Sequence, residues 1–286
     1  MKLFDFFKSL AYKRPENTGV LLGNNPEDYF AGANSPIIYK KRLESGDWTP
    51  YCLDEEPQYS NKGDSMACVS HSVINAIQAQ EYFLTGKKVN YSKRWLAKMS
   101  GTTRQGNYLN KVADTIRQYG LVLEEDYPAP SSFTWDEYHS NIPEPLNLQL
   151  LKKGQEWFKK WDFAYEFLQI NDANLDYHLK HSPIQIVIPG HAVCGIYSPD
   201  MYITYRDSYP QYNKKYAING LLSAMKPILT PTTLEAGFVK WNNHPEVWFM
   251  AKMDSMQRME KFKNFTFDGD YSVKEDITIL PTKKPF

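Results

Sequence analysis

The sequence predicts an α+β fold, because helical periodicity dominates its first half and strand-like runs dominate the part that follows. From Cys68 to about Leu84, apolar residues recur at intervals of three and four, as in a buried helix that ends at Gly86. Residues 183–210 are rich in Ile, Val and Tyr in short runs broken by Pro-Gly and Ser-Pro-Asp, which predicts an antiparallel meander. Helices followed by strands are typical of α+β proteins.

Further helices are expected on both sides of that division. One begins after Asn90, with Ser92 as its cap, and ends at Gly101, and the next ends at Gly120. Residues 121–130 then leave as an extended segment that ends at prolines. Residues 133–180 are expected to hold polar, aromatic-rich helices, one of which includes "QEWFKKWDFAYEFL".

The amino-acid composition argues against several classes of function. The chain has 286 residues, of which 42% are apolar, so it can bury a core. Lys plus Arg and Asp plus Glu are equal at 33 each, so no overall field would attract nucleic acid, and we expect no nucleic-acid partner. The three cysteines, Cys52, Cys68 and Cys194, form no CxxC pair. We therefore expect neither a disulfide framework nor a metal or other cofactor.

The chain divides into three parts. Residues 1–45 are predicted to form an amphipathic helix, with Leu3, Phe4, Phe7 and Leu10 at helical spacing, followed by an extended arm rich in Asn, Pro and Gly. That helix would dock on its own domain, on a protein partner or on a membrane surface. Residues 46–230 are expected to form the main domain, and residues 231–286 a C-terminal extension packed on it.

The N-terminal stretch does not have the form of a signal peptide, because Asp5 and Lys8 interrupt its apolar residues. No segment reaches the roughly 18 apolar residues that a membrane span needs. We therefore expect no transmembrane segment and a location in the cytoplasm of the producing cell, or association with a virion.

Cys68 is the strongest candidate for chemistry. It lies in the first turn of the predicted helix, where unpaired backbone N–H groups and the helix dipole stabilise a thiolate, the reactive form of cysteine. His71 is three residues away on the same helix, where a buried ring has little freedom, so we expect it to be a core or supporting residue.

His191 is the better candidate for the base. It begins one predicted strand, and Asp207 follows sixteen residues later in the next strand. Adjacent antiparallel strands of that length place such residues side by side, so that the carboxylate can orient the imidazole. A nucleophile, a base and an orienting group are the general components of covalent hydrolysis.

Over roughly residues 46–210, the sequence resembles the papain/cathepsin family of cysteine peptidases. "GDSMACVSHSVINAIQ" is similar to the segment that opens the family's nucleophile helix, "HAVCGIY" to its histidine strand, and "YITYRDSYP" to the segment that carries its Asn. The family's His and Asn follow the Cys by about 130–150 residues. The resemblance implies a papain-like fold, with a helical part carrying Cys68 and an antiparallel part carrying His191 and Asp207, and no cofactor.

The chain departs from the family's pattern at four points. Asp207 replaces an Asn, and Val69 replaces the aromatic residue after the nucleophile. The connection between the predicted strand "QIVI" and the strand that begins at His191 is only Pro189-Gly190, which is much shorter than in the family. Lys62 occupies the position six before Cys68 at which the family has an oxyanion-binding Gln. Gln58, Asn61 and Lys62 are the alternatives for that donor, and we favour Gln58, whose longer spacing a loop insertion could absorb.

Four other residues carry weaker signals. We expect Cys194 to point into the core and Asp64 to serve a turn or a cap. His178 and His181, three residues apart on a helix, are expected on a solvated face rather than at a metal.

Two functions follow. The first is a papain-like cysteine peptidase that hydrolyses peptide bonds of a protein or of a peptidoglycan stem by Cys68, His191 and Asp207, with Gln58 in the oxyanion hole. The alternative is a catalytically impaired structural or interaction protein on the same scaffold, for example a phage virion or tail component. The divergence from cathepsins resembles that of bacteriophage-encoded papain-like proteins.

Overall fold

The computed structural model describes residues 19–22, 30–31, 43–211 and 214–231. The predicted N-terminal amphipathic helix, most of the arm and the C-terminal extension from residue 232 onward lie outside the described residues. Within the described ranges, no helix is long and apolar enough to cross a membrane.

The predicted helices are present with close to their predicted bounds. The first is α2 (Cys68–Thr85), followed by α3 (Lys93–Met99) and α4 (Leu109–Tyr119). The Ser92 side chain caps α3 by accepting a hydrogen bond from the Trp95 N–H at 3.0 Å. Gly86 ends α2 in the left-handed conformation that glycine adopts without strain. The shorter helices are α5 (Trp135–Tyr138), α6 (Glu144–Trp157) and α7 (Asp172–Leu179), with 3-10 turns at Thr49–Tyr51 and Ile218–Gly220.

The strands of the described residues form one antiparallel sheet in the order β1-β2-β7-β3-β4-β5-β6. The predicted meander is its centre, with β3 (Ile184–Ile188), β4 (His191–Tyr197) and β5 (Tyr202–Arg206) paired in sequence. The remaining strands are β1 (Phe30–Ala31), β2 (Trp161–Phe167), β6 (Lys215–Ala217) and β7 (Ser223–Pro231). Helices and an antiparallel sheet together confirm the predicted α+β class.

One predicted helix was wrong. Residues 161–167, "WDFAYEF", form β2 rather than part of a helix, and they pair along their whole length with β7. The aromatic residues, at every second position, are buried, and the non-aromatic residues between them are half-buried. This is the period of a strand with one covered face. That alternation was the signal in the sequence, and the helical character of the preceding residues, now α6, obscured it.

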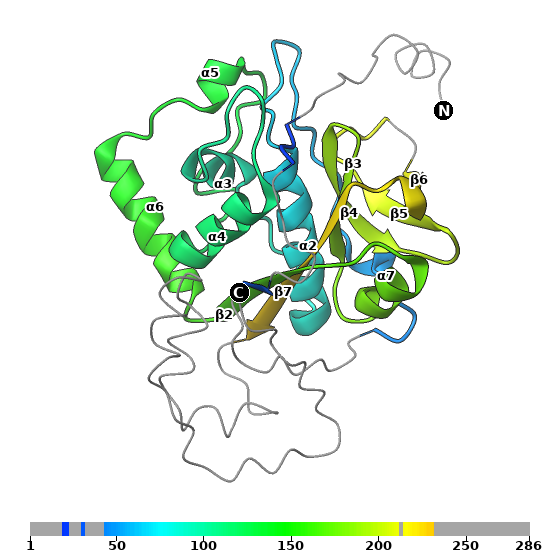
Figure 1. The fold of residues 1–286 in the computed structure, drawn as a ribbon. Coiled ribbons are helices and arrows are strands. Elements are labelled where there is room, and N and C mark those ends of the chain that lie inside the picture. Colours follow the sequence, from blue (N-terminus) through cyan, green and yellow to red (C-terminus); the bar gives the residue numbers. More distant parts are fainter. Residues whose placement is uncertain (1–18, 23–29, 32–42, 212–213, 232–286) are drawn as a thin grey trace, which may run out of the picture.

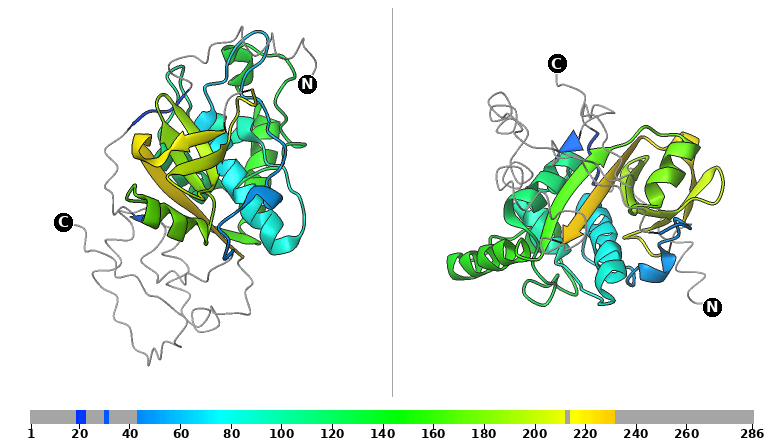
Figure 2. Two further views of the ribbon diagram at one scale, coloured as in Figure 1. Left: turned by 90° about the vertical axis from the view of Figure 1, so that its right-hand side faces the viewer. Right: turned by 90° about the horizontal axis from the view of Figure 1, so that it is seen from below.

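Helix α2 lies in the middle of the molecule. In Figure 1, helices α3 to α6 lie to one side of it and strands β3 to β6 with α7 lie to the other, and the view from below in Figure 2 shows the same division. Val69 and Val73 of α2 pack in the cluster shared with α4 and β2, and Ala76 and Ala79 pack in the cluster shared with β3, β4 and α7. A helix buried on both sides holds its first residue rigidly between the two halves.

Trp48 fixes the chain segment that precedes α2. Its ring is fully buried, its Nε1–H donates to the Leu179 carbonyl at 2.6 Å, and its edge packs on Phe83. The backbone N–H of Trp48 also donates to the carbonyl of Ile196 in β4 at 3.0 Å. Residues near the predicted start of the main domain are therefore part of its core.

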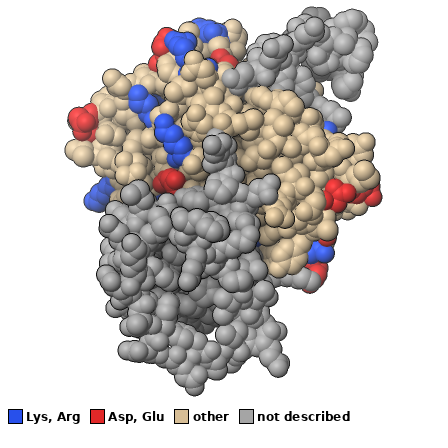
Figure 3. Space-filling model, viewed as in Figure 1, with Lys and Arg blue, Asp and Glu red and all other residues tan. Residues whose placement is uncertain are grey.

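Charges are interspersed on the face of the molecule seen in Figure 3. Over the described residues of that face, Lys and Arg alternate with Asp and Glu rather than gathering into one patch. The predicted absence of a nucleic-acid partner stays a prediction.

Candidate active site

The thiol of Cys68 lies at the junction of the two halves. Cys68 is the first residue of α2 and is fully buried, and the N-cap residue, Ala67, provides no side-chain hydrogen bond to the helix end. The backbone N–H of Ala192 donates to Cys68 Sγ at 3.5 Å, so the sulfur packs against the start of β4. The first residue of α2 and the first residues of β4 therefore meet.

His191 and Asp207 form a buried pair. The imidazole Nε2 lies 2.6 Å from Asp207 Oδ1, and both side chains are inaccessible to solvent. Cys194 of β4 faces Arg206 of β5, so the register places Asp207 one diagonal step from His191 on the same face. The hairpin that leads to His191 turns at Pro189-Gly190, and Gly190 has a φ of 69°, as a Pro-Gly turn of this kind requires.

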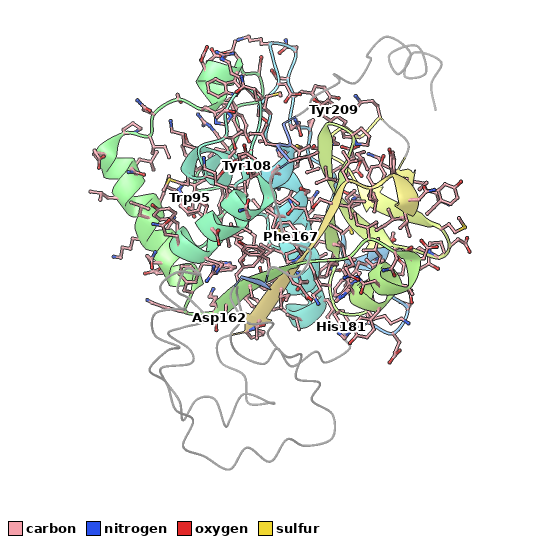
Figure 4. All side chains as sticks on the ribbon, viewed as in Figure 1. Trp95, Tyr108, Asp162, Phe167, His181 and Tyr209 are labelled. Carbon is pink, nitrogen blue, oxygen red and sulfur yellow. The ribbon has the colours of Figure 1, made fainter. Side chains whose placement is uncertain are left out.

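Tyr209 covers this pair, and the sequence analysis did not single it out. Its backbone N–H donates to Asp207 Oδ1 at 2.9 Å, and its ring meets the His191 ring edge-on at a centroid distance of 5.4 Å. Figure 4 places Tyr209 near the end of the molecule at which α2 begins. The available signal was its place in "YITYRDSYP", two residues after Asp207, where an aromatic residue shields a buried ion pair from water.

Gln58 lies beside these residues, at the base of a short hairpin that ends close to Cys68. Gln58 is fully buried, its backbone N–H donates to the Ser208 carbonyl at 3.1 Å, and its own carbonyl accepts from the Ser65 N–H at 3.0 Å. Ser60 and Gly63 close the tip of the hairpin. The spacing of ten residues to Cys68 is therefore absorbed by a loop, as the sequence analysis proposed for Gln58.

The two rival donors lie in that loop. Asn61 and Lys62 are both exposed, and Asn61 Oδ1 accepts from the Ser132 hydroxyl at 2.6 Å. Gln58, by contrast, contacts the residue that follows Asp207 through both its backbone and its side chain, whose Oε1 accepts from Ser208 Oγ at 2.6 Å.

Asp64 ties several of these residues together. Its Oδ1 accepts from Gln58 Nε2 at 2.9 Å and from the Met66 N–H at 2.7 Å, and its Oδ2 accepts from the Tyr209 hydroxyl. The predicted turn role of Asp64 describes only the Met66 contact. The contacts to Gln58 and Tyr209 join residues far apart in the sequence and could not be read from it.

His71 is buried behind the site. Burial, and next the charge of Lys93, lowers the pKa of His71 to about 3, although Glu56 and Asp207 both act in the opposite direction. An imidazole with that pKa is neutral near pH 7 and is a weak base. This supports the prediction that His71 is a supporting residue.

The remaining histidines differ in part from expectation. His178 and His181 are both buried, so the predicted solvated face was wrong. Nδ1 of His178 lies 2.9 Å from the buried Nζ of Lys226, and burial lowers the pKa of His178 to about 2, with the Lys226 charge contributing next. His181 lies towards the opposite end of the molecule from Tyr209 (Figure 4). No group of three or more His, Cys, Asp or Glu side chains in the described part of the chain could hold a metal.

The other two cysteines are chemically quiet. Cys194 is buried in the core, as predicted, and burial raises the pKa of its thiol well above the usual value. Burial also raises the pKa of the Cys52 thiol to about 12. Since only the thiolate reacts readily, neither is expected to compete with an activated cysteine.

Residues 19–22 pass close to the start of α2 and Cys68. Val20 is buried in the same cluster as Cys68, and the Leu21 N–H donates to the Asn107 carbonyl at 2.8 Å. A Cβ at Gly19 would lie 2.1 Å from the Met66 carbonyl oxygen, so the backbones touch two residues before Cys68. This described part of the arm therefore packs over the start of α2.

Comparison with known proteins gives structural similarities only. No protein-family model matches the sequence, and no curated protein matches it either. Solved structures similar to the chain include the Amb a 11 cysteine protease, a ragweed pollen allergen, in its proform, at 14% identity over 71% of this chain and 72% of that chain, with a TM-score of 0.47.

Two further similar structures are a digestive procathepsin L 3 of Tenebrio molitor and a cysteine protease of Carica candamarcensis. The first is 14% identical, covers 68% of this chain and 73% of that chain, and has a TM-score of 0.48. The second is 14% identical, covers 64% and 96%, and has a TM-score of 0.47.

Proposed function

We propose that the chain is a cysteine peptidase that hydrolyses peptide bonds, with Cys68 as nucleophile, His191 as base and Asp207 as the group that orients His191. The observation that carries the proposal is the buried contact of 2.6 Å between His191 Nε2 and Asp207 Oδ1, at the point where β4 touches the Cys68 sulfur. A buried carboxylate favours the charged imidazolium, which in turn stabilises a thiolate.

The roles of the atoms follow from this contact. With Nε2 engaged by the carboxylate, Nδ1 accepts the thiol proton, and the thiolate attacks the peptide carbonyl carbon. The carbonyl oxygen takes up the electron pair, and His191 returns the proton to the departing amine, which leaves a thioester on Cys68. Water activated by the same imidazole then hydrolyses the thioester and regenerates the thiol.

The oxyanion formed in the first step needs donors in place before the reaction. We propose the backbone N–H of Cys68, the first residue of α2, and an Nε2 hydrogen of Gln58. Removal of one such donor in other hydrolases lowers kcat by about 100-fold to 1,000-fold.

The substrate is proposed as a peptide, either within a protein or in a peptidoglycan stem. The test is to incubate the full chain with a protein-derived peptide library and, separately, with muropeptides, and to follow new amino termini by mass spectrometry. Cleavage of one library by the wild type and of neither by Cys68→Ala supports the proposal and selects the substrate class.

A second candidate function is a catalytically impaired structural or interaction protein, for example in a virion. The full burial of Cys68, with residues 19–22 packed over the start of α2, favours it. If the wild type cleaves neither library and Cys68 reacts no faster than the other cysteines, this candidate replaces the first.

A further inference from the structure

We propose that the Asp64 carboxylate is a positioning group for hydrolysis at Cys68 and that it acts by holding the amide of Gln58 in its working orientation. The inference rests on the proposed function and assigns a residue to it. Asp64 lies four residues before Cys68, at the end of the hairpin that begins with Gln58. It takes no part in bond making in this proposal, since its contacts are to other side chains and to the backbone.

The amide group of Gln58 has a fixed orientation. A carboxylate can only accept hydrogen bonds, so the Gln58 atom that faces Asp64 Oδ1 at 2.9 Å is the nitrogen. The Ser208 hydroxyl donates to Oε1 of the same amide at 2.6 Å. These two contacts exclude the flipped amide and fix the direction of the second Nε2 hydrogen, which is the one proposed to donate to the oxyanion.

The turn that precedes Cys68 has an unusual backbone conformation. Met66 has a φ of 56°, and it is the one described non-glycine residue with positive φ. Such a conformation costs a residue with a side chain about 1 kcal/mol or more and persists where its surroundings hold it. The Met66 N–H donates to Asp64 Oδ1 at 2.7 Å, which is the side-chain contact that stabilises this turn. The same oxygen therefore sets both the amide of Gln58 and the path of the backbone into α2.

Asp64 is also linked to the pair of His191 and Asp207. Asp64 Oδ2 accepts from the hydroxyl of Tyr209, whose ring lies edge-on to His191 and whose backbone N–H donates to Asp207. One carboxylate thus connects the proposed oxyanion donor with the ring that covers the proposed base. Tyr59 stacks on Tyr209 at a centroid distance of 5.1 Å and closes the outer side of this link.

Charge explains why Asp64 serves as a support and not as a contact to substrate. A carboxylate at the oxyanion itself would repel the developing negative charge. Here three donors, from Gln58, Met66 and Tyr209, engage its two oxygens and offset that charge. An Asn at this position keeps one acceptor oxygen for Gln58 and Met66 but carries no charge, so those hydrogen bonds weaken, and its NH₂ group can meet the Tyr209 hydroxyl only as a donor.

The experiment compares Asp64→Asn, Gln58→Ala and the double variant with the wild type in the full chain. Steady-state hydrolysis of a cleavable peptide gives kcat and KM, and the rate of Cys68 alkylation by iodoacetamide gives the reactivity of the thiol. Alkylation passes through no oxyanion, so it separates a loss of oxyanion stabilisation from a loss of thiol reactivity. Asp54→Asn, on an exposed residue of the same segment, is the matched control.

The expected result is a fall in kcat of about 10-fold to 100-fold for Asp64→Asn with KM changed less than about threefold, since the lost interaction acts in the transition state. Alkylation should stay within about threefold of wild type in both single variants. The double variant should lose no more than about threefold beyond Gln58→Ala, because Asp64 acts through Gln58. Asp54→Asn should match the wild type.

Several results would overturn the proposal. These are an unchanged kcat in Asp64→Asn, losses that multiply in the double variant, or an alkylation rate that falls by the same factor as kcat, which would indicate damage to the thiol or to the fold. If the wild type alkylates at Cys68 yet cleaves no peptide, the proposed function fails and this assignment with it. If the wild type cleaves peptides and only the Asp64 variant departs from expectation, the proposed function stands and the assignment alone fails.

Discussion

At the scale of single residues, the two candidate histidines differ in their surroundings more than in their distance from Cys68 along the chain. His191 Nε2 lies 2.6 Å from the buried Asp207 carboxylate, whereas His71 has a pKa lowered to about 3 by burial and then by Lys93. Proximity in sequence favoured His71, and the contact between two strands favours His191.

The first prediction separates the two histidines by kinetics. His71→Gln should retain at least a tenth of wild-type kcat/KM for peptide hydrolysis, because the amide can keep a hydrogen bond to the Glu56 backbone and no proton transfer depends on it. His191→Gln should lose about 1,000-fold or more, as removal of one member of such a triad does elsewhere. Equal losses in the two variants would show that the base is misassigned.

The second prediction concerns the stability cost of the same buried imidazole. His71 has a pKa of about 3 in the folded chain and about 6.5 when unfolded, so between these values the unfolded chain binds more protons and stability falls as pH falls. Each such group contributes a slope of up to about 1.4 kcal/mol per pH unit. The free energy of unfolding, measured with urea at pH 6 and pH 5, should therefore fall by about 1 kcal/mol less in His71→Gln than in wild type. An identical fall in both proteins would contradict the pKa assigned to His71.

At the scale of elements, helix periodicity predicted α2, α3 and α4 to within a few residues because apolar spacing and terminal glycines act locally. Strand β2 was missed because its partner is β7, more than fifty residues later, and the alternation of its aromatic residues follows directly on a helix. Tertiary pairing overrode the helical propensity of the segment. The positions of Cys68, His191 and Asp207 were predictable from the order of elements. The hairpin contacts of Asp64 were not, because they depend on how a loop folds back.

The third prediction concerns the segment that enters the main domain at Trp48. Trp48→Ala should destabilise the chain by about 3–5 kcal/mol, as expected for the removal of a large, fully buried ring, and it also deletes the hydrogen bond to Leu179. Thermal or urea denaturation of the full chain measures this. Tyr51→Ala, in the same turn but half-buried, is the control and should cost less. A loss below about 1 kcal/mol for Trp48→Ala would mean that this segment is not part of the core.

The fourth prediction concerns the segment of residues 19–22. Gly19→Ala would place a Cβ against the Met66 carbonyl at 2.1 Å and at a φ of 111°, so the segment must shift away from the start of α2. If residues 19–22 cover the thiol, the alkylation of Cys68 should accelerate several-fold. Gly86→Ala, where a Cβ would meet nothing within 4 Å, is the control for substitution at a positive φ. An unchanged rate in Gly19→Ala would show that the segment does not limit access.

At the scale of the whole molecule, a helix buried between two halves brings together groups that no local pattern connects. Helix α4 and strand β2 pack on one side of α2, strands β3 and β4 with α7 pack on the other, and the thiol at the first residue of α2 meets the strand that begins with His191 (Figure 1). The fold class followed from periodicity, and the candidate nucleophile and base were proposed from element order together with the resemblance. The substrate depends on surface loops whose chemistry has no such regularity.

Selective alkylation measures whether Cys68 is an activated nucleophile. The full chain is treated near pH 7 with limiting iodoacetamide, a small reagent suited to a buried thiol, and the extent of labelling at Cys52, Cys68 and Cys194 is read by peptide mass spectrometry. We expect Cys68 to be labelled at least tenfold faster than the other two, whose thiol pKa values burial raises, and we expect His191→Gln to remove this advantage. Labelling of Cys68 no faster than that of Cys52 or Cys194 would contradict this expectation.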